Sequence, residues 1–141
     1  MIRDLAKDAV FSERCILGSL WLRPGLWGYA SELSPADFLL EDHRVLFEAI
    51  CHINARQEVA DVANVTRYLD TLYEEGTAHA ARLAALWLDC EFGVVPEGIQ
   101  GHVRYVKKAS QERRRVRELA AEFSEITGDS KYLPSSFEVT L

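Results

Sequence analysis

The sequence is poor in the features that mark β-hairpins, disulfide frameworks and membrane spans. It contains no Asn-Gly or Asp-Gly pair and no sustained alternation of apolar and polar residues, so it predicts no β-sheet. No apolar run approaches the roughly 20 residues needed to cross a bilayer. The three cysteines (Cys15, Cys51 and Cys90) are isolated, which argues against a disulfide framework and for a reducing compartment. Acidic Asp4 and Asp8 interrupt any apolar signal-peptide core. These absences predict a soluble, cytoplasmic protein.

The composition is that of one globular domain with an uneven charge distribution. The 141 residues are 48% hydrophobic and 27% charged, and the net charge is -6. Seven basic residues and one acidic residue lie between Arg104 and Arg117, so this segment is strongly basic in an acidic chain. Such asymmetry indicates a surface that meets a partner.

Helical periodicity runs through the first half of the chain. A helix is predicted over 12–22, with an inner stripe of Ile16, Leu17 and Leu20, and a shorter one over 26–33. The Ser34-Pro35-Ala36-Asp37 stretch predicts a brief capped turn that delivers Phe38 to the core. A third helix is predicted over 43–55, capped by Asp42, with Leu46, Phe47, Ile50 and Ile53 inward.

The second half predicts two short helices and one long one. Asp61 is expected to cap a helix over 62–75 with Val65, Leu69 and Leu72 inward, ended by Gly76. Thr77 is expected to cap a helix that reaches Asp89, with Leu83, Leu86 and Trp87 buried. The long helix is predicted over 97–127, ended by Gly128. We expect residues 1–128 to form one all-α domain, a head of five to six helices with a long C-terminal helix, and 129–141 a flexible tail.

The residue patterns that would carry catalysis or a cofactor are scarce. Cys51 and His52 are adjacent, but the other cysteines and histidines are scattered singly, without the paired spacing of zinc sites. There is no Gly-x-Ser-x-Gly elbow and no Gly-x-x-x-x-Gly-Lys-Ser/Thr loop for phosphates. The sequence predicts no metal, no cofactor and no enzyme activity.

An ordered set of short motifs runs along most of the chain. The stretches are Ser12-Glu13-Arg14-Cys15-Ile16-Leu17-Gly18-Ser19-Leu20, Leu33-Ser34-Pro35-Ala36-Asp37-Phe38, His43-Arg44-Val45-Leu46-Phe47-Glu48-Ala49-Ile50, Asp61-Val62-Ala63-Asn64-Val65, Val95-Pro96 and Tyr105-Val106. In order and spacing this set resembles one known family, the N-terminal (collar) domain of DnaB-type replicative helicases. The residues that carry the motifs are expected to be mainly structural: Glu13, Leu17, Gly18, Asp37, Phe38, His43, Arg44, Phe47, Asp61, Pro96 and Tyr105.

The resemblance implies a helical head, a helical hairpin that pairs copies, and docking of primase, loader or helicase proteins in DNA replication. The sequence departs from the family after Gly128, where a short segment with Pro134 stands in place of the hairpin's second helix. At 1.5 Å rise per residue, the last helix is too long to lie wholly on so small a body, so its outer half is expected to project and to form a dimer. The expected interface residues are Val106, Arg113, Val116, Leu119 and Phe123.

The basic segment leaves three interpretations open. Its exposed residues are predicted to contact nucleic-acid phosphates, to contact an acidic protein partner, or to form a solvated face. The residues concerned are Arg104, Lys107, Lys108, Arg114, Arg115 and Arg117. Nucleic-acid binding by the helix over 104–117 is the alternative function, although only Tyr105 offers an aromatic ring for stacking there.

Overall fold

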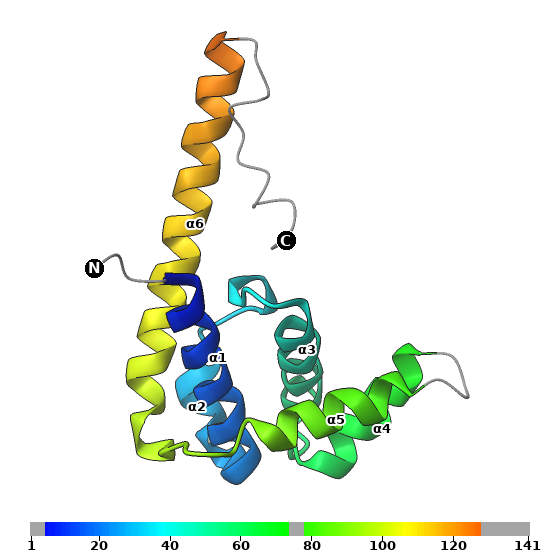
Figure 1. The fold of residues 1–141 in the computed structure, drawn as a ribbon. Coiled ribbons are helices and arrows are strands. Elements are labelled where there is room, and N and C mark those ends of the chain that lie inside the picture. The colour runs from blue at the N-terminus through cyan, green and yellow to red at the C-terminus, as the bar shows by residue number, and fades with distance from the viewer. Residues whose placement is uncertain (1–4, 74–77, 128–141) are drawn as a thin grey trace.

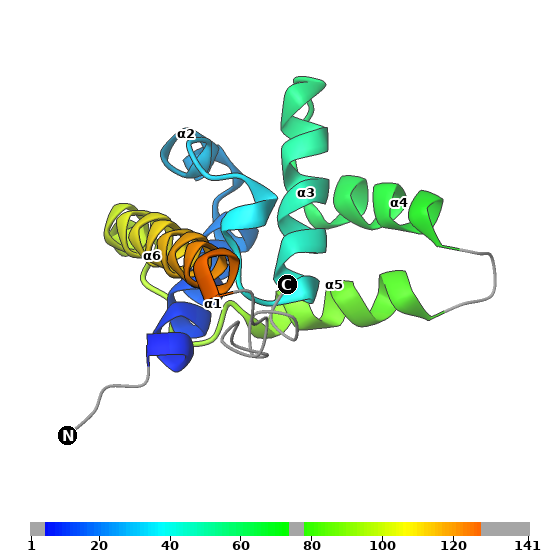
Figure 2. The same cartoon turned by 90° about the horizontal axis from the view of Figure 1, so that it is seen from above.

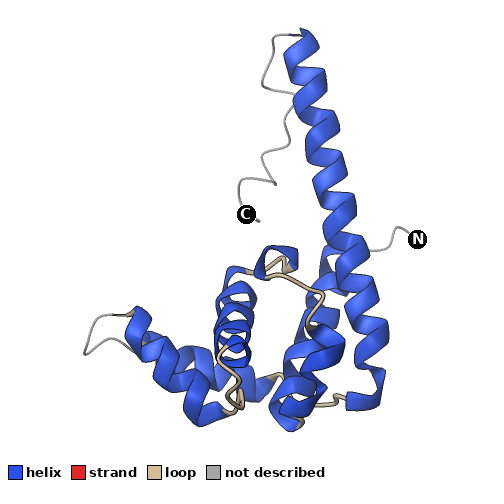
Figure 3. Cartoon of the chain, turned by 180° about the vertical axis from the view of Figure 1, so that it is seen from behind, coloured by secondary structure: helices blue, strands red, loops and turns tan. Residues whose placement is uncertain are grey.

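A computed structural model describes residues 5–73 and 78–127, and helices make up all the regular secondary structure in those ranges (Figure 3). The elements in chain order are α1 (Leu5–Leu22), η1 (Pro24–Leu26), α2 (Trp27–Ala30), η2 (Pro35–Asp37), α3 (Glu41–Ala55), α4 (Val62–Leu72), α5 (His79–Asp89), η3 (Pro96–Gly98) and α6 (Ile99–Thr127). The prediction of an all-α fold with a long C-terminal helix is confirmed.

The head surrounds one apolar core, and α6 rises from its side (Figure 1). Helix α1 runs beside the lower half of α6, while α3, α4 and α5 form the opposite side of the head (Figures 1 and 2). With 29 residues at 1.5 Å rise each, α6 is about 43 Å long. Its outer half extends past the head, as Figure 1 shows.

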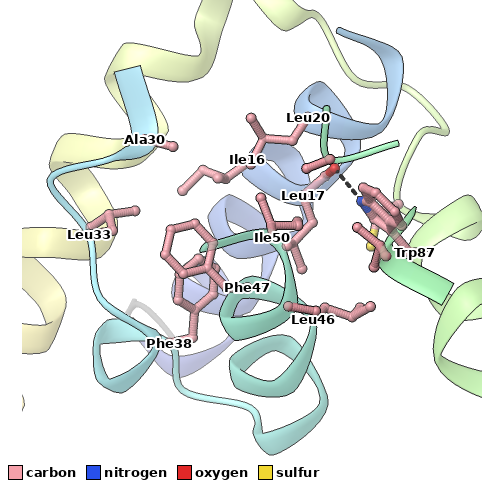
Figure 4. Close-up of a cluster of buried hydrophobic side chains, with 14 of the residues drawn as sticks. Ile16, Leu17, Leu20, Ala30, Leu33, Phe38, Leu46, Phe47, Ile50 and Trp87 are labelled. Atoms are coloured by element: carbon pink, nitrogen blue, oxygen red, sulfur yellow. Dashed lines mark hydrogen bonds between the residues drawn. The ribbon is translucent and has the colours of Figure 1, made fainter. Parts of the chain in front are cut away.

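The core joins residues from every side of the head (Figure 4). Phe38 lies with its ring centroid 4.6 Å from that of Phe47. Trp87 is fully buried and its Nε1–H donates to the Leu17 carbonyl at 2.8 Å. Burial of each such side chain contributes on the order of 2 kcal/mol to folding. The predicted inner stripes of the helices over 12–22 and 43–55 are confirmed, since all of their named residues are buried.

Helix α1 begins at Leu5, several residues earlier than predicted. The early turns are stabilised by packing against α6 that no local pattern reveals. Ala9 is buried, the Phe11 ring meets His102 edge-on at 6.0 Å, and Ser12 Oγ lies 3.2 Å from His102 Nδ1. The helix predicted over 26–33 is shorter and splits into η1 and α2.

The predicted caps had mixed outcomes. Asp61 Oδ1 accepts from the Asn64 backbone N–H at 2.9 Å, so that cap is confirmed. Asp42 is not a cap: Leu40 occupies that position, and Asp42 lies in the first turn of α3, where it pairs with Arg82 of α5. Leu72 ends α4 and is 46% exposed, so its predicted burial was wrong.

Several residues for which a role was predicted lie outside the described part of the chain. Thr77 lies outside the described residues, and the position before α5 is held by Ala78, whose side chain makes no capping hydrogen bond. Glu75, Gly76, Gly128 and the tail 129–141 also lie outside them.

Candidate protein-interaction surface

A buried carboxyl group holds the turn between η2 and α3. Glu13 of α1 has no exposed surface, and its Oε2 accepts from the Leu39 backbone N–H at 2.6 Å. Its Oε1 accepts from the Leu40 N–H at 3.5 Å and lies 2.8 Å from Nδ1 of buried His43. Because these groups replace the water that the carboxyl loses, Glu13 ties three elements together.

The same turn is attached to α6. The Asp37 carboxyl group accepts from the Ser34 N–H and from the Ser110 hydroxyl of α6, both at 2.8 Å. Arg113 Nη2 donates to the Asp37 carbonyl at 2.9 Å. Arg44 Nη1 donates to the carbonyls of Phe38 and Leu39. Polar residues of α3 and α6 therefore converge on this turn and fix the direction in which α6 leaves the head.

Gly18 allows α1 to touch the end of α5. A Cβ atom built on it would lie 2.1 Å from the Cys90 carbonyl oxygen, which is far inside contact distance. α1 therefore makes a close approach at Gly18, where its neighbour is the C-terminal end of α5 and not the side of another helix. Trp21 packs edge-on against Trp87 at 4.8 Å.

The remaining motif residues lie in or beside the head. Leu17, Phe38 and Phe47 are core residues, Pro96 begins η3, and Tyr105 is half-buried on α6. This geometry supports the mainly structural role expected for the motif set.

The outer half of α6 carries an apolar stripe that the head does not cover. The exposed fractions of Val116, Leu119 and Phe123 are 49%, 53% and 49%, and Ile126 follows at 84%. At about 100° per residue, this stripe points about 120° away from the residues with which α6 packs on the head.

Two of the expected interface residues face the chain's own head. Val106 is 1% exposed and belongs to the core, and Arg113 is half-buried against Asp37, where burial lowers the pKa of its guanidinium group. Both were expected at the interface, but they lie where α6 still packs on the head. Only Val116, Leu119 and Phe123 remain at a candidate interface.

The basic residues of α6 separate into two rows. Arg104, Lys108 and Arg115 are exposed and lie nearly opposite the head-facing side. On the head side, Lys107 Nζ donates to the Glu32 carbonyl at 3.2 Å and lies 3.8 Å from Asp37 Oδ2. Arg114 and Arg117 line an open groove of about 570 Å³ at the junction with the head. Sequence reasoning placed these cations on one helix but missed this groove, because its other wall comes from η2 and α3.

Within 5–73 and 78–127 no three His, Cys, Asp or Glu side chains lie together as metal ligands would. No helix in the same ranges is long and apolar enough to span a membrane.

Comparison of the chain with known protein families agrees with the resemblance that the motif residues indicate. A family model of the DnaB-like helicase N-terminal domain matches residues 6–108, from α1 to the first third of α6. No curated protein sequence matches the chain. The matched region contains the Glu13 contacts, the η2 turn and Gly18, which together build the head. With nearly three quarters of its length matched, the chain belongs to the DnaB-like helicase N-terminal domain family.

Proposed function

We propose that the protein is a non-catalytic interaction module of DNA replication that pairs with a second copy through the outer half of α6 and docks primase, a loader or a helicase. The observation that carries the proposal is the half-exposed row of Val116, Leu119 and Phe123 on a helix that extends past its head. Exposed apolar side chains in a contiguous row favour association with another apolar surface. We place this action in the cytoplasm, where isolated cysteines stay reduced.

The charges along α6 favour an antiparallel pair. The segment from Arg104 to Arg117 is basic, whereas the acidic residues Glu118, Glu122 and Glu125 follow it with no basic residue up to Thr127. Parallel pairing would align like charges, and antiparallel pairing places the acidic end of one helix beside the basic part of the other. Arg115 is exposed on a flank of the stripe, where it is available for such a contact.

Light scattering tests the pairing. The parent chain is expected at twice its mass of 16.0 kDa. The substitution Phe123→Asp is expected to shift it to the monomer, because it places a charge in the apolar stripe. Gln111→Asp is the matched control, since Gln111 is exposed on α6 but lies off the stripe. A parent chain that stays monomeric at every concentration contradicts the pairing.

Docking is tested with purified replication proteins. We expect the immobilised chain to bind the helicase, the primase or the loader of its source cell, and the docking role is rejected when none of the three binds. The alternative role, nucleic-acid binding by 104–117, predicts DNA affinity that falls steeply between about 50 and about 200 mM salt. The supporting observation for it is the exposed row of Arg104, Lys108 and Arg115.

A further inference from the structure

The groove between α6 and the head collects arginine side chains from two elements. It is lined by Ala36, Arg44, Ser110, Arg114, Arg117, Glu118 and Ala121. Among the described residues, three arginine side chains and one glutamate therefore line the same hollow. The hollow lies beside the basic part of α6, whereas the chain as a whole carries a net charge of -6.

The walls of the groove are built from parts of the fold that hold one another in place. Arg44 contacts the carbonyls of Phe38 and Leu39 at 3.1 and 2.8 Å, which fixes its side chain beside the turn. Ser110 donates to Asp37 in the floor of the junction. Arg114 is exposed on the α6 wall. A site of this kind is preorganised, because little side-chain entropy remains to be lost at Arg44 on binding.

From this arrangement we infer that the groove docks an acidic helical segment of a partner protein, whose carboxylates are bound by Arg114, Arg117 and Arg44. The guanidinium fork matches a carboxylate in a two-point contact. Ala36 and Ala121 leave room on the two walls for a helix to approach closely. The inference rests on the proposed docking role but not on pairing through α6.

The charges nearby favour a protein segment over a nucleic-acid backbone. A duplex presents a negative charge about every 1.7 Å along its axis and needs a long uninterrupted row of cations. Glu118 lines the groove itself, and Glu122 and Glu125 are exposed farther along the same helix. A few carboxylates on one helix face fit between these acidic residues, whereas a continuous phosphate chain would run against them.

The groove and the apolar stripe lie on opposite sides of α6. Arg114 and Ala121 point about 170° from the mean direction of Val116, Leu119 and Phe123, and Arg117 points about 130° from it, at about 100° per residue. A second copy seated on the stripe therefore leaves the groove open. One surface would pair copies while the other holds the acidic segment.

Fluorescence anisotropy on the full chain tests the inference. The probe is a fluorescein-labelled peptide of repeated Glu-Ala-Ala-Glu units, with the glutamine version of the same peptide and labelled oligo-dT as comparisons. We expect the glutamate peptide to bind most tightly and the double variant Arg114→Ala, Arg117→Ala to weaken it by about tenfold or more. The double variant Arg104→Ala, Lys108→Ala removes the same charge from the other row and is expected to change affinity less than about threefold.

Three results of the binding measurements would overturn the inference. Equal losses of peptide affinity in both double variants would mean that only the total charge matters. That result would overturn the inference that the groove binds the peptide. Equal binding of the glutamine peptide, or tighter binding of oligo-dT, also overturns it. Arg114→Ala alone, at an exposed position, keeps the test valid if the double variant unfolds, as circular dichroism will show. A chain that binds a replication protein but not the peptide refutes the groove while leaving the proposed docking role intact.

Discussion

The Nδ1 atom of His43 lies 2.8 Å from the Oε1 atom of Glu13, and both side chains are buried. The two residues come from α3 and α1, and the same carboxyl group accepts from the backbone of the turn between η2 and α3. The contact therefore ties the turn that holds α6 to the centre of the head. Its loss would leave several buried polar groups without partners.

Replacing Glu13 by alanine is expected to lower the free energy of unfolding by about 3 kcal/mol. The cost arises because the Leu39 N–H and His43 lose their acceptor in a site that water does not reach. Urea denaturation followed by circular dichroism measures it. Glu122→Ala, which removes an exposed carboxylate from the outer half of α6, is the control and is expected to stay within about 0.5 kcal/mol of the parent chain. Equal effects of the two substitutions would contradict this stabilising role of the buried Glu13 carboxyl group.

Gly18→Ala and Gly101→Ala are expected to act in opposite directions. Both glycines are helical, and alanine is favoured over glycine by about 1 kcal/mol in a helix. At Gly101 nothing lies within 4 Å of the added Cβ, so the substitution should stabilise the fold. At Gly18 the Cβ would meet the Cys90 carbonyl oxygen at 2.1 Å, so α1 and α5 must separate, at a cost of about 1–3 kcal/mol.

Thermal melts of the two glycine variants beside the parent chain decide the question. A Gly18→Ala protein that melts at or above the parent temperature would mean that the close approach of α1 to Cys90 is absent.

Local signals predicted the elements well and their long-range contacts poorly. The turn at Ser34–Asp37 and the Asp61 cap were readable because each joins groups three residues apart, within one turn of chain. The amphipathic stripes predicted the core of α3 for the same reason. Trp87 was assigned to the core, but its hydrogen bond to Leu17 spans 70 positions, and no periodicity encodes it.

The stripe and the groove differ in the same respect, because the first depends on local spacing and the second on long-range contacts. Val116, Leu119 and Phe123 belong to one helix, so their stripe was predictable from their spacing. The groove needs Arg44 from α3 opposite Arg114 and Arg117 from α6, and only the folded chain brings them together. Arg113 was expected at the interface, but its guanidinium group donates to the Asp37 carbonyl, a contact 76 positions away that the helix pattern does not encode.

The three thiols are expected to react slowly in the folded protein. Burial raises the pKa values of Cys15 and Cys90, and burial with the nearby Glu48 carboxylate raises the pKa of Cys51 to about 11. Because the thiolate is the reacting form, very little of it is present near neutral pH. A disulfide reagent such as 5,5′-dithiobis(2-nitrobenzoate) should titrate the thiols much more slowly in buffer than in urea. Prompt reaction of all three in buffer would contradict the burial.

Asp42 is expected to add a small pH-dependent contribution to stability. The hydrogen bond from Arg82, strengthened by its charge, lowers the pKa of Asp42 below its ordinary value of 3.8. A carboxyl group with a lowered pKa in the folded state binds fewer protons than it does in the unfolded state. Its contribution is therefore fully present above the ordinary pKa and is lost as the pH falls through the folded-state pKa. Asp42 is partly exposed, so solvent screening keeps the effect small.

The measurement compares Asp42→Asn with the parent chain in urea denaturation between about pH 7 and about pH 2.5. The parent should be the more stable protein at neutral pH, and the gap should close at the acid end, where both side chains are uncharged. Asp70→Asn provides the control, because Asp70 is exposed on α4 and none of the ion pairs found in the described residues involves it. A gap for Asp42→Asn that stays constant down to the acid end would mean that the aspartate acts through packing in the first turn of α3 and not through its charge on Arg82.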